Sequence, residues 1–172
     1  MFRKKTNRNK KKVYVGFAAD ILHEGHMNIL KVASQFGDVI VGLLTDEAIT
    51  SYRQLPHLNY KQREIILKNI KFVNKVIPQK TLDYTENLNS IKPDYVLHGD
   101  DWRSGIQKIV RKKVIKVLKK WSGKLIEVSY TKNISYSIMK SKNIKTGTTP
   151  EIRKSKLRRL VEAKNITRIL ET

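Results

Sequence analysis

Apolar positions along the chain alternate between short runs typical of β-strands and longer segments in which they recur with helical spacing. The strand-like runs are Lys12–Phe17, Val39–Leu44, Lys75–Ile77, Tyr95–His98 and Leu125–Val128. Helical spacing predicts one helix through Ile29, Val32, Ala33 and Phe36, a second through Ile66, Leu67, Ile70 and Val73, and a third over Ile106–Lys120, whose apolar stripe includes Ile109. Strands that alternate with helices indicate parallel pairing. The pattern therefore predicts an α/β fold, a Rossmann-like doubly wound parallel sheet of about five strands, with one or two short helices unassigned.

The pattern changes after Val128. Residues 129–150 are polar, and the stretch from Gly147 to Pro150 is typical of a connector. Residues 151–172 then predict a basic C-terminal helix with its apolar residues roughly on one side. That side needs a partner, either the sheet or a further segment of chain.

Charge is distributed unevenly along the 172 residues, which carry a formal net charge of +21. Residues 1–12 contribute +7, residues 13–107 contribute −1 and residues 108–172 contribute +15. We expect a site for a specific small ligand in the nearly neutral middle. The basic ends are interpreted mainly as solvated surface, with nucleic acid or an acidic membrane as alternatives.

The composition fits one domain with a real core, since 40% of the residues are hydrophobic. The absence of cysteine excludes a disulfide scaffold, a thiolate nucleophile and Cys-ligated zinc. The basic first dozen residues do not predict a signal peptide, because the apolar run that follows stops at Asp20. No run approaches 18 apolar residues, so no membrane span is predicted and a cytoplasmic protein is expected.

The sequence His23-Glu24-Gly25-His26 follows the first predicted strand and opens the first predicted helix, where a doubly wound fold receives phosphate. Two histidines three residues apart lie on one side of a helical turn, and Gly25 lets the backbone approach a ligand closely. Imidazole N–H donors suit the charge that develops in phosphoryl-type transfer. A structural histidine pair and a zinc site are the alternatives; the helix lacks a third zinc ligand, so no metal ligand is predicted.

The segment Gly16–His26 resembles the nucleotide-binding signature of the cytidylyltransferases, within the HxGH nucleotidyltransferase superfamily. Further matching blocks follow in the family's order: Gly37–Gly42 with Thr45–Glu47, Tyr60–Arg63 with Lys71–Pro78, His98–Trp102, and Ile134–Lys140. The resemblance implies a cytidylyltransferase domain over residues 13–142, between a basic tail over residues 1–12 and a segment over residues 143–172.

Narrower likenesses point to the cytidylyltransferase domain fused ahead of phosphoenolpyruvate mutase in some phosphonate-producing organisms. They are carried by Ser51–Pro56, Thr81–Tyr84 and His98–Arg103. Residues 146–172 resemble the linker and first helix of the mutase, which implies a mutase domain or partner. The resemblance also implies a homodimer.

The resemblance assigns roles to individual residues. His23 and His26 would stabilise the pentacoordinate transition state at the α-phosphate of CTP, with Lys140 as a further catalytic cation. The nucleotide-binding set is Phe17, Ala18, Asp20, Gly25, Asp100, Asp101, Trp102, Ser135 and Ser137, and the substrate-binding set is Arg53 and Arg63. Taken alone, the two aspartates Asp100 and Asp101 are also typical of helix caps, Trp102 of packing, and Arg63 of a helix surface.

The predicted activity is a magnesium-dependent transfer of CMP from CTP to a phosphonate, such as 2-hydroxyethylphosphonate or 2-aminoethylphosphonate, with release of pyrophosphate. The enzymatic alternatives are a phospho-alcohol acceptor, glycerol 3-phosphate or phosphocholine, and an adenylyltransferase. Nucleic-acid binding by the basic ends is a further alternative, disfavoured because residues 140–172 contain no aromatic side chain on which bases could stack.

Overall fold

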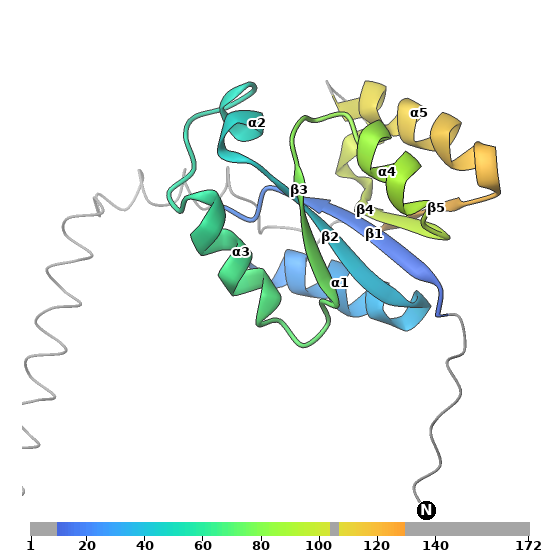
Figure 1. Cartoon of the computed structure of the whole chain (residues 1–172), viewed down its shortest axis with the longest axis horizontal. Helices are drawn as coiled ribbons and strands as arrows, with labels where there is room; N and C mark the ends of the chain where they lie inside the picture. Colours follow the sequence, from blue (N-terminus) through green and yellow to red (C-terminus); the bar gives the residue numbers. More distant parts are fainter. Residues whose placement is uncertain (1–9, 104–106, 130–172) are drawn as a thin grey trace, which may run out of the picture. The chain divides into compact units, whose positions relative to one another are not determined.

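Five parallel strands form one sheet in the computed structural model, which describes residues 10–103 and 107–129 (Figure 1). The strands are β1 (Lys12–Phe17), β2 (Asp38–Leu44), β3 (Lys75–Gln79), β4 (Tyr95–Gly99) and β5 (Lys124–Val128). Their order is β3-β2-β1-β4-β5, with every pairing parallel. This order confirms the predicted doubly wound sheet. The predicted basic helix lies outside the described residues.

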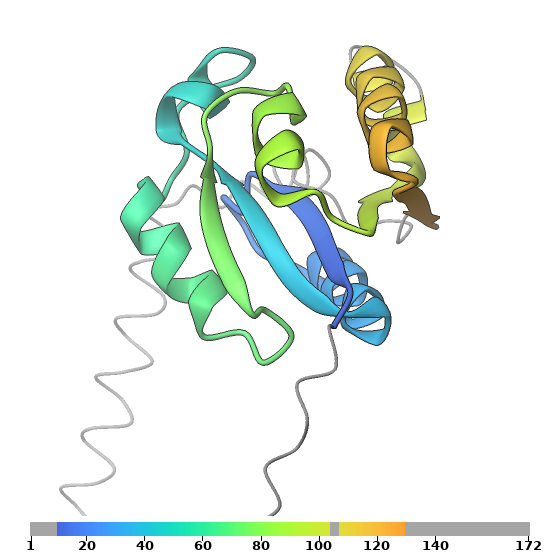
Figure 2. The same ribbon diagram turned by 45° about the vertical axis from the view of Figure 1, so that its right-hand side comes forward.

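Helices cover both faces of the sheet. The longer ones are α1 (Glu24–Phe36), α3 (Tyr60–Lys68), α4 (Thr85–Ile91) and α5 (Gln107–Leu118); the shorter ones are α2 (Asp46–Thr50) and the 3₁₀ turns η1 (Asp100–Arg103) and η2 (Lys119–Trp121). Helices α1 and α3 pack on one face, α4 and α5 on the other. Figure 2 shows α4 and α5 next to each other on that second face.

The central strand β1 explains why both faces need cover. Val13 and Val15 pack in the cluster under α1 and α3, whereas Tyr14 packs in the cluster under α4 and α5. All three side chains are fully buried. A continuous apolar run is what a strand buried on both faces requires.

The structure corrects two details of the predicted helices. Helix α3 ends at Lys68, so Ile70 and Val73 lie beyond it, although both still pack against the first cluster. Ile109 is 62% exposed on α5 and does not belong to its buried stripe, which consists of Val114, Val117 and Leu118. The unassigned short helices are α2 and α4.

The carboxyl ends of the strands meet at one edge of the sheet. There the chain leaves β1 for α1 and β4 for η1, and the strand order reverses between these two strands. Folds of this class bind ligands in the crevice at that point. No helix within residues 10–103 and 107–129 is long and apolar enough to cross a membrane.

Candidate active site

His23 and His26 cap the first turn of α1 reciprocally. The Nδ1 atom of His23 accepts a hydrogen bond from the Gly25 N–H at 3.2 Å, and Nδ1 of His26 accepts one from the His23 N–H at 3.3 Å. A ring nitrogen that accepts carries no proton, so each neutral ring holds its proton on Nε2. The helix start therefore sets the tautomer of both rings and leaves each with one Nε2–H donor.

Both rings are neutral near pH 7. Burial, with smaller contributions from the neighbouring charges of His23 and Arg53, lowers the pKa of His26 to about 4. Burial also lowers the pKa of His23. The ring centroids are 4.0 Å apart. The two histidines thus form a compact pair of neutral N–H donors at the positive end of the α1 dipole.

Phe17 supports this pair from the end of β1. Its side chain is buried, and its ring meets the His26 ring edge to face, with centroids 5.0 Å apart. Gly16, one place earlier, leaves room for the Tyr84 ring, which a Cβ atom there would overlap. The Phe17 side chain therefore packs under His26, and the predicted part of Phe17 in nucleotide binding stays a prediction.

Arg63, predicted to bind the substrate, is 0% exposed. Its Nη1 donates to the carbonyl oxygens of Ala18 at 2.5 Å and Leu44 at 2.8 Å, and its Nε donates to Leu58 O at 2.9 Å. Its Nη2 pairs with Asp46 Oδ1 at 2.6 Å. In this structure Arg63 joins the ends of β1 and β2 to the start of α3, and its contact with a substrate stays a prediction.

Asp20 lies in the loop before His23, and its side chain is only 2% exposed. Its Oδ1 accepts from the backbone N–H of His57 at 2.6 Å, and its Oδ2 accepts from the His57 ring Nδ1 at 3.2 Å. Both carboxylate oxygens are thus directed at one residue of the α2–α3 connection. The structure places Asp20 as a bridge between two loops.

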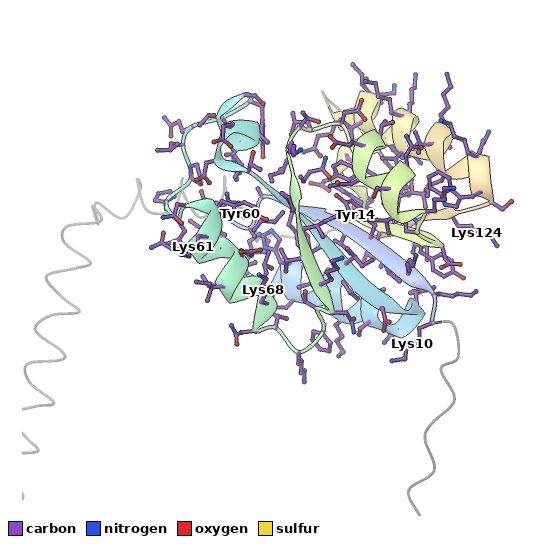
Figure 3. All side chains as sticks on the ribbon, viewed as in Figure 1. Lys10, Tyr14, Tyr60, Lys61, Lys68 and Lys124 are labelled. Atoms are coloured by element: carbon purple, nitrogen blue, oxygen red, sulfur yellow. The ribbon has the colours of Figure 1, made fainter. Side chains whose placement is uncertain are left out.

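Arg53 belongs to the same connection as His57. Its guanidinium lies 5.4 Å from the centroid of the Tyr52 ring, and its charge is close enough to His26 to contribute to the lowered pKa of that ring. Figure 3 shows Tyr60 at the start of α3, where the connection ends. Of the two predicted substrate arginines, Arg53 is the one that the structure brings near the histidine pair.

The Asp100-Asp101-Trp102 block forms η1 after β4. Trp102 is 1% exposed, stacks on His98 with ring centroids 3.8 Å apart, and donates from Nε1 to Glu127 Oε1 at 2.9 Å. The indole belongs to the second core cluster, and the predicted nucleotide contact of Trp102 stays a prediction. Asp101 is exposed, with its Oδ1 3.7 Å from His98 Nδ1, and Asp100 is half-buried beside it.

Two residues near this edge were not predicted from the sequence. Glu127 of β5 accepts from Trp102, from Arg103 at 2.8 Å and from Arg111 at 2.8 and 3.0 Å. These donors hold its pKa far below the usual range. His98 is the next-to-last residue of β4, and burial lowers the pKa of its ring. The sequence did contain a signal for Glu127, because it is the one acidic residue in the predicted apolar strand Leu125–Val128.

Of the remaining predicted site residues, two lie within the described part of the chain and three lie outside it. Ala18 contributes its carbonyl to Arg63, and Gly25 is buried in the first turn of α1. Ser135, Ser137 and Lys140 lie outside the described residues. Within residues 10–103 and 107–129, no group of three or more His, Asp or Glu side chains is arranged to hold a metal ion.

The sequence matches the cytidylyltransferase-like family over residues 14–159. Glycerol-3-phosphate cytidylyltransferase of Bacillus spizizenii is 38% identical over 97 residues, 54% of this chain and 74% of that protein. Ethanolamine-phosphate cytidylyltransferase of Dictyostelium discoideum is 33% identical over 132 residues, 76% of this chain and 36% of that protein.

Solved structures give a consistent fold. The lipopolysaccharide core biosynthesis protein of Thermoplasma volcanium superposes with a TM-score of 0.60 at 21% identity, over 71% of this chain and 98% of that chain. Pantothenate synthetase of Thermus thermophilus gives 0.53 at 13% identity, over 87% of this chain and 66% of that chain. At these identities the likeness shows the α/β fold alone.

Proposed function

Because this chain, a nucleotidyltransferase, belongs to the cytidylyltransferase-like family, we propose that it transfers CMP from CTP to a small phosphorylated alcohol and releases pyrophosphate. The observation that carries the proposal is the His23–His26 pair, whose Nδ1 atoms are used within the helix start. Each neutral ring therefore carries its proton on Nε2 and can donate one hydrogen bond to a ligand. Such a pair suits an α-phosphate whose oxygens gain charge in the transition state.

The chemistry needs no covalent enzyme intermediate. A phosphate oxygen of the acceptor attacks the α-phosphorus of CTP, and the bond from that phosphorus to the oxygen leading to the β-phosphate breaks, so pyrophosphate leaves. A phosphate dianion has no proton to lose at the attacking oxygen, so no general base is required. His23 and His26 donate hydrogen bonds to non-bridging α-phosphate oxygens, and the α1 N-terminus adds a favourable dipole.

A phospho-alcohol is favoured over the phosphonate as acceptor. The relatives at 38% and 33% identity are named for glycerol 3-phosphate and ethanolamine phosphate, which are both phosphate monoesters. Neither name includes a phosphonate. We place Arg53 near the anionic group of the acceptor, because the connection that carries it is bonded through His57 to Asp20 in the loop before His23, and a guanidinium suits a phosphate.

Magnesium enters the proposal only as the counterion of CTP. The described residues do not build a metal site, and the buried Asp20 carboxylate already bridges to His57. Magnesium commonly binds through substrate phosphates with few protein ligands. No step above depends on a protein-held metal ion.

Phosphorus NMR of the purified protein with magnesium and CTP tests the proposed function. The acceptor panel is glycerol 3-phosphate, phosphoethanolamine, phosphocholine, 2-hydroxyethylphosphonate and 2-aminoethylphosphonate, and a parallel series replaces CTP by ATP. We expect a new diphosphate signal with pyrophosphate only for CTP and a phospho-alcohol. Product from a phosphonate alone would restore that acceptor, product from ATP alone would change the base, and silence throughout would reject the proposal.

A homodimer and a mutase partner stay predictions. Ile65 and Ile66 of α3 are 53% and 41% exposed, which gives a second copy an apolar surface on which to dock. Light scattering that shows a dimer would support this assembly, and a monomer at micromolar concentration would reject it. The segment that resembles the mutase, residues 143–172, lies outside the described residues, and copurification with a mutase tests it.

A further inference from the structure

Asp20 and His57 join two loops at the edge of the sheet that holds the histidine pair. The residues are 37 positions apart, yet both oxygens of the Asp20 carboxylate are bonded to His57, one to its backbone N–H and one to its ring. The Asp20 side chain is 2% exposed, whereas the His57 ring is 64% exposed. A buried carboxylate with both oxygens directed at one residue is a fixed structural link.

The backbone before Asp20 supports this interpretation. Ala19 has φ +50° and is 3% exposed, so the chain turns through the left-handed region directly before the carboxylate. A non-glycine residue in this region is unfavourable and persists only where the surrounding contacts fix it. The turn and the carboxylate together set the path of the chain from β1 to His23.

A second link lies next to the first. Arg63 donates to Ala18 O on one loop and to Leu58 O on the other. Residues 57 and 58 are therefore held to residues 20 and 18 by two neighbouring charged groups. The segment fastened in this way, residues 51–59 between α2 and α3, carries Arg53.

We infer that Asp20 and His57 are positioning residues that hold the 51–59 segment, and with it Arg53, beside the histidine pair to receive the anionic group of the acceptor. The inference rests on the proposed function. It assigns Asp20 to acceptor recognition through His57 and Arg53, and not to direct contact with the nucleotide. A carboxylate aimed at CTP would repel its phosphates, whereas a carboxylate buried against His57 does not meet them.

Steady-state kinetics of four variants test the inference. Asp20→Ala removes both hydrogen bonds of the link, whereas His57→Ala removes only the ring bond and keeps the one from the His57 backbone N–H. His57→Asn returns a side-chain N–H near the position of Nδ1, and Leu55→Ala changes an exposed side chain of the same segment as the matched control. We expect Asp20→Ala to raise KM for the acceptor about 10-fold, the size typical of a lost hydrogen bond to a charged group, and His57→Ala to raise it less, because the backbone bond remains. We expect kcat and KM for CTP to stay within about threefold, since the histidine pair is untouched.

Two further comparisons separate positioning from general damage to the fold. His57→Asn should recover most of the acceptor KM, and the double variant Asp20→Ala/His57→Ala should be no worse than Asp20→Ala alone, because the two residues act as one unit. Leu55→Ala should behave as wild type. A raised KM for CTP in Asp20→Ala with no effect of His57→Ala would overturn the inference and make Asp20 a nucleotide ligand.

Hydrogen exchange gives a readout that does not depend on turnover. In Asp20→Ala, which removes both hydrogen bonds of the link, we expect faster exchange confined to the backbone amides of residues 51–59, with α1 unchanged. Exchange as slow as in Leu55→Ala would overturn the inference. A wild-type protein inactive on every acceptor would reject the proposed function separately, and the exchange result would still decide whether the pair holds the segment.

Discussion

The two sides of the sheet's carboxyl edge are each organised around one charged side chain, but the charges are satisfied differently. On the β1–β2 side, the fully buried Arg63 is held by three backbone carbonyl oxygens and by Asp46. On the β4–β5 side, Glu127 is held by Trp102 and by the side chains of Arg103 and Arg111, which are 60% and 30% exposed.

The difference shows which side tolerates loss of its central charge. Without Arg63, three carbonyl groups lose their donor next to the core, and the partly exposed Asp46 carboxylate keeps only the bond from the Tyr60 N–H. Without the charge on Glu127, two partly exposed arginines are solvated again at little cost. The side that carries the histidine pair is therefore the more rigidly specified of the two.

Arg63→Ala should produce the largest loss of stability. We expect the free energy of unfolding to fall by about 3–5 kcal/mol, because the variant removes the buried cation of an ion pair and leaves three carbonyl oxygens without their donor. Arg63→Lys should recover only part of this, since an ammonium group cannot reach four acceptors in a planar fork. Urea unfolding measures both, and a loss below about 1 kcal/mol in Arg63→Ala would contradict the assigned role.

Acid should weaken the β1–β2 side first. The pKa of His26 is about 4 in the folded chain, against 6.5 for an unperturbed histidine. As the pH falls from 6.5 to 4, the unfolded chain takes up the proton before the folded chain does, so stability falls and then levels off below pH 4.

The size of this effect is on the order of 3 kcal/mol. It is measured as the difference in urea unfolding between wild type and His26→Gln at pH 7, 5.5 and 4, since the contributions of other groups cancel. A difference that stays constant over this range would show that the ring is protonated as readily in the fold as in the unfolded chain.

Glu127→Gln should have a smaller effect, and the contribution of Glu127 is lost at lower pH than that of His26. The donors around Glu127 lower its pKa below the ordinary 4.5, so its contribution to stability is complete above pH 4.5 and is lost as the pH falls below that value. We expect a loss of about 1–2 kcal/mol at pH 7, reduced by the exposure of the arginines. A thermal or urea difference that persists unchanged at pH 2.5 would contradict the assignment.

Trp102→Phe should be the mildest change. Phenylalanine keeps an aromatic ring against His98 but loses the hydrogen bond to Glu127, which costs about 1 kcal/mol. Because Trp102 is buried in the second core cluster, we expect kcat and KM for CTP to change less than about threefold. A large rise in KM for CTP with normal stability would return Trp102 to the nucleotide site.

The elements of the fold that have a clear local pattern of apolar residues were predicted from the sequence. The apolar runs of β1 and β2 and the helix that opens at the histidine motif are confirmed. Helices α2 and α4 have five and seven residues, too few for a helical period to emerge. Before β5, the 3₁₀ turn η2 ends at Trp121, and the left-handed conformation falls on Ser122, at φ +61°, a position that the apolar pattern does not mark.

In the candidate site, too, the features set by local sequence were predicted, and those set by distant contacts were not. The position of His23 and His26 at a strand-to-helix turn is local and was predicted. The burial of Arg63 depends on partners 5, 17, 19 and 45 residues away, and its place on an amphipathic helix resembles that of a surface arginine. The link between Asp20 and His57 is equally non-local. Residue type and spacing indicate which chemistry a side chain can perform. Whether that side chain faces a ligand or the core depends on contacts with residues far away in the sequence, which local pattern does not reveal.

The central claim is that two neutral N–H donors at the start of α1 catalyse CMP transfer. The most direct test is turnover of wild type, His23→Ala and His26→Ala with CTP and the acceptor identified by phosphorus NMR, alongside urea unfolding to verify folding. Each variant should lose about 10²- to 10³-fold in kcat while still folding, the usual effect of removing one transition-state donor. Turnover close to wild type in either folded variant would contradict the claim.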